Sequence, residues 1–157
     1  MATYVISDIH GEYGKFMELL DIIHFSVEDI LYVLGDVVDR GKNPVKTLLK
    51  MMEMPNVIPI VGNHEQMMLE CMSVLINEVK DENSIKEFAE KFSDDMFQKL
   101  YAGQRNGGIA TTDELSKLDN ETRKDVLDYV ADFSWYEKVE VNAVSYTHLR
   151  AHETPEH

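Results

Sequence analysis

Cysteine is nearly absent from the 157-residue chain: Cys71 is the only one, so no disulfide can form within it. Cys71 lies in a helical pattern among methionines, and no nearby motif would activate a thiol. We therefore interpret it as a small buried hydrophobic residue. There is no apolar run of about 18 residues, which argues against a membrane-spanning helix. The N-terminus has no basic or apolar segment of the kind found in secretion signals, so we expect a cytoplasmic protein.

Positive charge is also scarce, with 15 Lys and Arg against 29 Asp and Glu and a formal net charge of −14. This balance argues against a nucleic-acid partner, which a basic surface would serve. It does not exclude a phosphate substrate, because bound cations and one arginine can dominate the local potential. The sequence does not specify an oligomeric state.

The first sixty residues alternate β-rich and helical segments. Strands are expected at residues 2–7, 30–34 and 57–61, with amphipathic helices between them. The continuous apolar run 30–34 is typical of a strand buried on both faces, whereas Pro59 indicates an edge or a bulge. Asn43 and Pro44 resemble an N-cap and a first helical residue. We therefore predict an α/β fold with a parallel βαβαβ core.

The remainder is predicted to be mainly helical. Apolar stripes run from residue 63 to residue 100, one of them through Ile85, Phe88, Ala89 and Phe92. The segment 103–108 predicts a glycine-rich loop, and 111–114 (Thr-Thr-Asp-Glu) predicts a capping box. A helix containing Val126 and Val130 and a strand at 139–144 follow.

Each predicted strand leads into a short motif of chemically active residues. The motifs are Ser7-Asp8-Ile9-His10-Gly11, Gly35-Asp36-Val37-Val38-Asp39-Arg40-Gly41 and Gly62-Asn63-His64-Glu65. Asp8 and Asp36 are 28 positions apart and Asp36 and Asn63 are 27 apart, about one βαβ unit each. All three motifs therefore fall at the carboxyl edge of one sheet, where ligands bind in such folds.

Asp8, His10, Asp36 and Asn63 form a mixed nitrogen and oxygen donor set that suits two divalent ions, Mn, Fe or Zn. Asp36, in the middle motif, is the expected bridging ligand. Asp39 and His64 form a plausible pair in which the carboxylate orients an imidazole acid. Arg40 supplies a planar fork for a phosphoryl group. This is the inventory of a two-metal phosphoester hydrolase.

The same strings resemble the phosphoprotein phosphatase branch of the calcineurin-like metallophosphoesterases. The segment 62–68 is similar to the bacterial and phage serine/threonine phosphatases. The resemblance implies the N-terminal half of the metallophosphoesterase sandwich and hydrolysis of phosphomonoesters by a metal-bridging hydroxide. It implies a phosphoprotein or small phosphoester substrate and metal binding by Asp8, His10, Asp36 and Asn63. His64 would be the general acid, with Asp39 as its partner and Arg40 on the phosphate.

The family's later motifs are not found in this sequence. Relatives carry His-Ala-Gly and Gly-His-Thr strings and a second phosphate-binding arginine, so we expect an incomplete second metal site and little activity from the chain as written. Residues 144–157 resemble a translated sequencing-library adapter, which predicts a partial domain at 1–143 and a non-native tail. His148 and His152 in that tail are not expected to be ligands. Two alternatives stay open: a symmetrical bis(5'-nucleosyl)-tetraphosphatase, and a non-catalytic metal-binding fragment.

Overall fold

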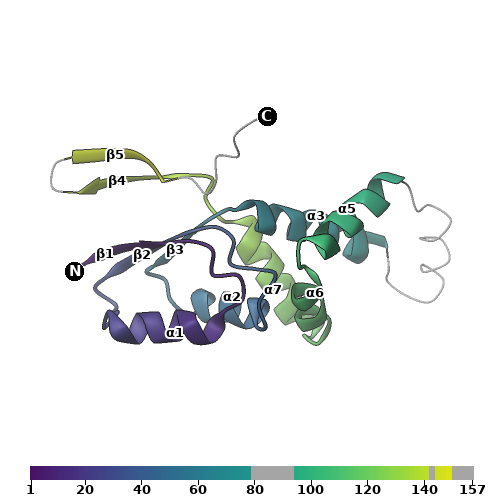
Figure 1. The fold of residues 1–157 in the computed structure, drawn as a ribbon, viewed down its shortest axis with the longest axis horizontal. Helices are drawn as coiled ribbons and strands as arrows, with labels where there is room; N and C mark the ends of the chain where they lie inside the picture. The colour runs from purple at the N-terminus through teal and green to yellow at the C-terminus, as the bar shows by residue number, and fades with distance from the viewer. Residues whose placement is uncertain (79–93, 142–143, 150–157) are drawn as a thin grey trace.

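The computed structural model describes residues 1–78, 94–141 and 144–149 and contains a three-stranded parallel sheet (Figure 1). The strand order is β1-β2-β3, and the pairs Thr3 with Ile30 and Leu31 with Val57 set the register. The elements are β1 (Thr3–Ile6), α1 (Tyr13–Ile22), β2 (Ile30–Leu34), α2 (Pro44–Met52) and β3 (Val57–Ile60). The predicted parallel βαβαβ core is therefore confirmed.

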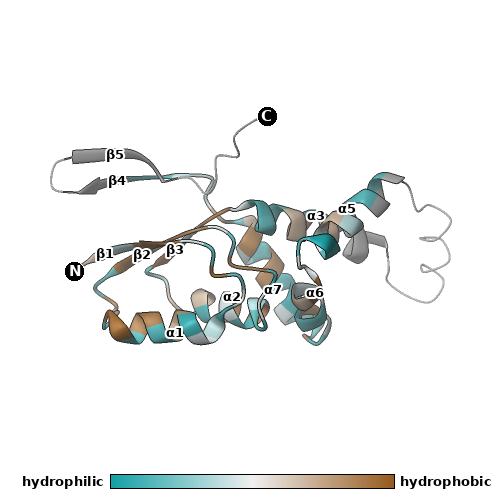
Figure 2. Cartoon of the chain, viewed as in Figure 1, coloured by the Kyte–Doolittle hydropathy of each residue, from teal (hydrophilic) through white to brown (hydrophobic). Residues whose placement is uncertain are grey.

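The central strand β2 carries the core of this unit. Leu31, Tyr32 and Val33 are all buried, as expected for a strand covered on both faces. Helices α1 and α2 lie together on one face of the sheet, and Phe16 and Leu48 are buried in the same core (Figure 1). Hydrophobic residues are concentrated along the strands in Figure 2. This core fixes the positions at which the three strands end.

Strand β3 lies at an edge of this sheet, which confirms the prediction from Pro59. Past its end, the amide of Val61 donates to the carbonyl of Ser134 at 2.8 Å, and Ile60 forms an isolated parallel bridge with the same residue. The segment that follows the last helix thus attaches to the open edge.

The second half adds four described helices and a hairpin. They are α3 (Asn63–Glu78), α5 (Asp94–Arg105), α6 (Ile109–Ser116), α7 (Asn120–Ala131), β4 (Glu137–Val141) and β5 (Val144–Leu149). No helix in the described part of the chain is long and apolar enough to cross a membrane. The apolar stripe at Ile85, Phe88, Ala89 and Phe92 lies outside the described residues.

Two predicted boundaries in this half are wrong. The expected loop at 103–108 is shorter, because α5 continues to Arg105 and Gly103 packs beside Cys71. The expected single strand at 139–144 is the antiparallel pair β4 and β5. Strand β5 falls within residues 144–157 and contains His148, whereas His152 lies outside the described residues.

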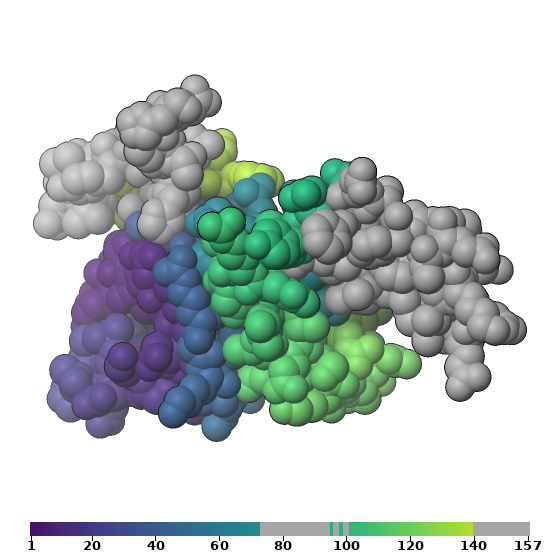
Figure 3. Space-filling model, turned by 45° about the vertical axis from the view of Figure 1, so that its right-hand side comes forward, coloured from purple at the N-terminus to yellow at the C-terminus, as the bar shows by residue number. Residues whose placement is uncertain are grey.

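Capping also differs from the prediction. Helix α2 begins at Pro44 as expected, but the side chain of Asn43 does not cap it. The Glu114 carboxylate from α6 accepts the amides of Val45 at 2.7 Å and Lys46 at 3.3 Å instead. Because α6 already begins at Ile109, residues 111–114 lie inside that helix and the predicted capping box is wrong. Figure 3 shows α2 (blue) in contact with α6 (green).

Candidate metal centre and acid–base pair

The loops that follow β1 and β2 are joined by their backbones. The amide of Asp8 donates to Gly35 O at 3.3 Å, and the amide of His10 donates to Asp36 O at 2.8 Å. After β3, the amide of His64 donates to Asp36 Oδ1 at 3.3 Å. The three motifs therefore meet at one edge of the sheet, as their spacing predicts.

Unusual backbone conformations are concentrated at this edge. Six non-glycine residues of the described chain have positive φ, and five belong to the first two motifs: Asp8 (56°), His10 (46°), Asp36 (55°), Asp39 (67°) and Arg40 (65°). Such conformations cost on the order of 1–3 kcal/mol each and persist where the surroundings fix them. Clustering of such conformations in the loops after β1 and β2 is typical of a functional site.

His10 has one nitrogen engaged and one directed at carboxylates. Its Nδ1 lies 3.0 Å from Val38 O, so this nitrogen carries the proton and donates. Its Nε2 is buried without a hydrogen-bond partner among the residues that the structure describes, 3.8 Å from Asp8 Oδ1 and 4.0 Å from Asp36 Oδ2. A buried lone pair facing two carboxylates has the chemistry of a metal ligand whose other nitrogen is held by the backbone. The donor set therefore fits a divalent cation.

His64 is the third residue near this point. Ligand atoms of His10, Asp36 and His64 lie within 4.8 Å of one another. Both ring nitrogens of His64 are occupied, however: Nδ1 lies 2.8 Å from Asp39 Oδ2, and Nε2 lies 3.2 Å from Arg40 Nη2. Arginine can only donate, so Nε2 accepts and Nδ1 carries the proton. These bonds favour an acid–base role for His64 over metal ligation.

Asp39 and His64 form a buried pair, with side chains 2% and 1% exposed. The hydrogen bond that His64 donates to Asp39 raises the pKa of His64 above its ordinary value, and the negative charge of Asp36 adds to this. Burial alone lowers the pKa of His64 but is the smaller effect. The sequence motifs predict this pairing, and the structure brings the two side chains together.

Asp8 and Asn63 stand at the margin of the site. The Asp8 side chain is 44% exposed, whereas Asp36 is buried. Asn63 is the exposed first residue of α3, directly before His64. Their assignment as metal ligands stays a prediction. Asn106, considered above only as part of a loop, donates to Ala102 O at 2.8 Å and belongs to a turn.

Glu65 is a site residue that the sequence reasoning missed. It is fully buried, and its carboxylate accepts four backbone amides at 2.8–3.2 Å, from Asp36, Val37, Val38 and Gly62. The hydrogen bond to the amide of Gly62, three residues earlier, has the spacing of a capping box. That spacing is the one sequence signal that could have identified Glu65. Burial raises the pKa of Glu65, opposed by the four amides. Glu65 thus ties the motif after β2 to the motif after β3.

Gly62 is required by this arrangement. A Cβ at that position would lie 2.4 Å from Asp36 Oδ1 and 2.7 Å from Glu65 Oε2, closer than real Cβ contacts allow. The glycine therefore lets the turn after β3 approach the central carboxylate directly.

Comparison with known proteins identifies the family. The family model for calcineurin-like phosphoesterases matches residues 1–156. The chain belongs to this family. It is 35% identical over 89 residues to the symmetrical bis(5'-nucleosyl)-tetraphosphatase of Wigglesworthia glossinidia brevipalpis, covering 55% of the chain and 32% of that protein. The corresponding enzyme of Nitrosomonas europaea is 40% identical over 67 residues, covering 41% of the chain and 25% of that protein.

A crystal structure provisionally named as a diadenosine tetraphosphatase shares the fold with a TM-score of 0.51 and 17% identity, covering 86% of this chain and 48% of that one. The chain thus spans about a third or less of the curated relatives it matches and about half of this structure. The expected phosphoprotein phosphatase branch is a more distant resemblance than the tetraphosphatases. The comparisons therefore favour the alternative, a symmetrical bis(5'-nucleosyl)-tetraphosphatase, over a serine/threonine phosphatase.

The Asp39–His64 pair leads to a pH prediction. In Asp39→Asn we expect the His64 ring to titrate at lower pH than in the unsubstituted metal-free chain, because the bond that raises its pKa is weakened. Because the pKa of His64 is higher in the folded than in the unfolded chain, its protonation stabilises the fold fully at pH values below the unfolded-state pKa of about 6.5. This stabilisation is lost as the pH rises through the folded-state pKa. NMR titration of the ring protons measures it, with Asp21→Asn as an exposed control. An unchanged titration in Asp39→Asn would contradict the assigned pair.

Proposed function

We propose that this chain provides the metal-binding and proton-donating part of a hydrolase site that acts on symmetrical dinucleoside tetraphosphates. One observation carries the hydrolase assignment: the buried Nε2 of His10, which has no hydrogen-bond partner in the described part of the chain, faces Asp8 and Asp36 beside the Asp39–His64 pair. Clustered carboxylates and imidazole next to a held acid are the parts of metal-assisted phosphoester hydrolysis.

Divalent cations would be held by His10 and Asp36, with Asp8 and Asn63 completing the donor set at the margin. When bound, they would polarise a phosphoryl oxygen and lower the pKa of water to generate the nucleophile. His10 is already oriented for this role, because the carbonyl of Val38 fixes its tautomer. Glu65 keeps the backbone around Asp36 in place.

Arg40 and His64 act on the substrate in sequence. The exposed Arg40 guanidinium now donates to His64 Nε2, and a phosphoryl group is a stronger, bidentate acceptor for it. Binding of the phosphate therefore releases Nε2, which takes up a proton with the help of the raised pKa of His64. Asp39 stabilises the resulting imidazolium, and Nε2 donates the proton to the leaving oxygen.

The substrate class is proposed from the curated relatives, whose printed names specify symmetrical tetraphosphatases. Phosphoserine and phosphothreonine proteins are the second candidate, because the three motifs resemble that branch as well. The third hypothesis is that the chain is a fragment that binds metal ions without catalysing hydrolysis. These readings make different predictions for the same set of assays.

Diadenosine tetraphosphate and a phosphoserine peptide should be assayed in parallel with Mn²⁺, for the 157-residue chain and for any longer reading frame that contains it. In the longer reading frame we expect the tetraphosphate to be cleaved faster and to give only ADP, with EDTA abolishing the reaction. The 157-residue chain, in which the family's later motifs are not found, should show little turnover. Cleavage of the peptide alone would support the phosphatase reading, and metal binding without either reaction would support the fragment.

His64→Gln provides a matched control for these assays. A departing ADP is a weakly basic phosphate, whose last pKa is about 6, whereas a departing serine alkoxide requires a proton. The substitution should therefore slow cleavage of the peptide far more than cleavage of the tetraphosphate. Equal losses on both substrates would contradict the role of His64 as the proton donor.

A further inference from the structure

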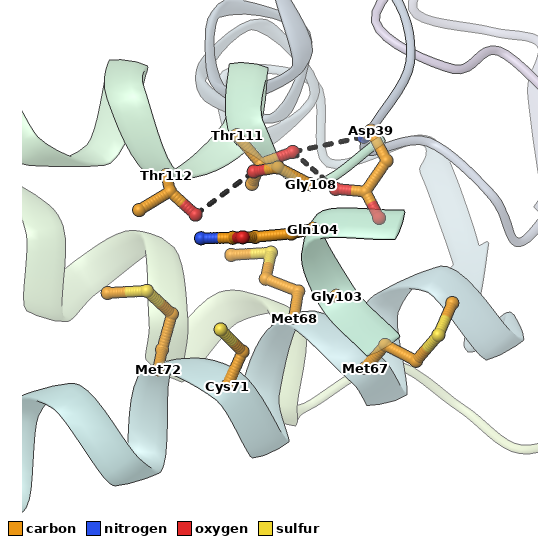
Figure 4. Close-up of a pocket in the computed structure, with 10 residues that line it drawn as sticks. All are labelled: Asp39, Met67, Met68, Cys71, Met72, Gly103, Gln104, Gly108, Thr111 and Thr112. Carbon is orange, nitrogen blue, oxygen red and sulfur yellow. Dashed lines mark hydrogen bonds between the residues drawn. The ribbon is translucent and has the colours of Figure 1, made fainter. Parts of the chain in front are cut away.

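Thr111 makes two hydrogen bonds to Asp39 from a helix 72 residues further along the chain. Its Oγ1 accepts the Asp39 amide at 3.0 Å and donates to Asp39 Oδ1 at 2.6 Å (Figure 4). The side chain is buried, with 2% of its surface exposed. A hydroxyl is the only small group that can accept and donate in this way.

These bonds determine which oxygen of Asp39 faces the imidazole. Oδ1 is taken by Thr111, so Oδ2 is the atom that lies 2.8 Å from His64 Nδ1. The backbone of Asp39 is in the left-handed region at φ 67°, where a residue other than glycine needs support. Thr111 supplies that support at both the amide and the carboxylate.

The residues around Thr111 hold the neighbours of Asp39 as well. Gly107 O accepts the amide of Arg40 at 3.0 Å, and Glu114 accepts the amide of Val45 at 2.7 Å. Gly107 has φ 95°, and a Cβ there would lie 2.9 Å from Arg40 Cγ. The segment 107–114 therefore contacts residues 39–45, the end of the second motif and the start of α2, at three points.

We propose that Thr111 is a positioning residue: by holding Asp39, it sets the orientation and the tautomer of His64. The proposal deepens the proposed function, because it rests on His64 as the proton donor. Without the hydroxyl, Asp39 can rotate and share both oxygens, and His64 loses the single arrangement in which Nδ1 carries the proton. A solely structural threonine would affect stability and leave the imidazole unchanged.

Valine is the appropriate substitution, because it matches threonine in shape and lacks the hydroxyl. Thr111 also borders a cavity of about 250 Å³ whose lining includes Met67, Met68, Cys71 and Met72 (Figure 4). The methyl group that replaces Oγ1 faces the amide and carboxylate of Asp39, so the folding of this variant has to be checked. Thr111→Ser keeps the hydroxyl, and Thr112→Val removes a neighbouring exposed hydroxyl that donates to Gly108 O.

The decisive readout needs no turnover. ¹⁵N–¹H NMR of the metal-free 157-residue chain, at a pH above the measured titration of the ring, reports the tautomer of neutral His64, with His64→Gln identifying its signals. We expect one Nδ1-protonated tautomer in the unsubstituted chain, in Thr111→Ser and in Thr112→Val. Thr111→Val should show a mixture of the two tautomers.

If circular dichroism shows that Thr111→Val is unfolded, Thr111→Ala serves as the second hydroxyl-free variant. The same single tautomer in folded Thr111→Val or Thr111→Ala would overturn the proposal.

Kinetics give an independent test when the same substitutions are made in a longer reading frame that turns over diadenosine tetraphosphate with Mn²⁺. Because Thr111 acts only through His64, Thr111→Val should lower kcat for diadenosine tetraphosphate by no more than His64→Gln does, at unchanged KM, and Thr111→Ser should restore it. A rise in KM with kcat preserved would contradict positioning. The turnover of the unsubstituted protein tests the proposed function, and the tautomer tests Thr111, so the two can fail separately.

Discussion

Replacing Glu65 with leucine is expected to lower the free energy of unfolding by on the order of 4 kcal/mol or more. Four buried backbone amides, from Asp36, Val37, Val38 and Gly62, lose their acceptor in this variant. Each unsatisfied buried donor costs about 1–3 kcal/mol, and small domains are stable by only about 5–15 kcal/mol. Urea unfolding followed by circular dichroism measures the loss.

Two further variants define the cause. Glu65→Gln keeps the shape and one acceptor oxygen, so we expect a smaller loss than in Glu65→Leu. Glu18→Gln removes the same charge from an exposed position on α1 and should leave the midpoint unchanged. If Glu65→Leu unfolded at the same urea concentration as the unsubstituted chain, the four amide bonds would not hold the site together.

Asp36→Asn is expected to weaken Mn²⁺ binding at least about 100-fold, because even supporting residues of metal sites change affinity by about 10- to 100-fold. Asp36 is a buried carboxylate that lies 4.0 Å from His10 Nε2 and accepts the His64 amide at the start of α3. The asparagine keeps the shape of the side chain and removes the negative charge. Isothermal titration calorimetry on the 157-residue chain measures the affinity.

The control for this experiment is Asp21→Asn, which removes one negative charge from an exposed position on α1. It should bind Mn²⁺ as the unsubstituted chain does, which separates a specific ligand from the overall negative charge. Equal affinity in Asp36→Asn and Asp21→Asn would show that Asp36 does not hold the ion.

The positions of the motifs were predictable because they depend on local sequence and on chain length. A continuous apolar strand and intervals of about one βαβ unit place Asp8, Asp36 and His64 at one edge without further information. The pairing of Asp39 with His64 followed from the residue types that remained at that edge. These features depend on the order of elements, which a sequence pattern carries.

The partners that stabilise the site were not predictable in the same way. Thr111 and Glu114 contact Asp39 and Val45 across about 70 residues, and their local pattern favoured a capping box. Thr111 and Glu114 instead lie inside helix α6. The packing of α6 against α2 gives their side chains hydrogen-bond partners that are distant in sequence. Glu65 was overlooked because a buried carboxylate is exceptional, and only the backbone amides around it explain it.

The most direct test of the metal site is a crystal grown with Zn²⁺ and examined by anomalous diffraction. The account predicts a peak about 2.0–2.1 Å from His10 Nε2 and about 2.0–2.2 Å from a carboxylate oxygen of Asp36. His64 should remain bonded to Asp39. A peak elsewhere, with none between His10 and Asp36, would contradict the assignment of this edge of the sheet as a metal centre.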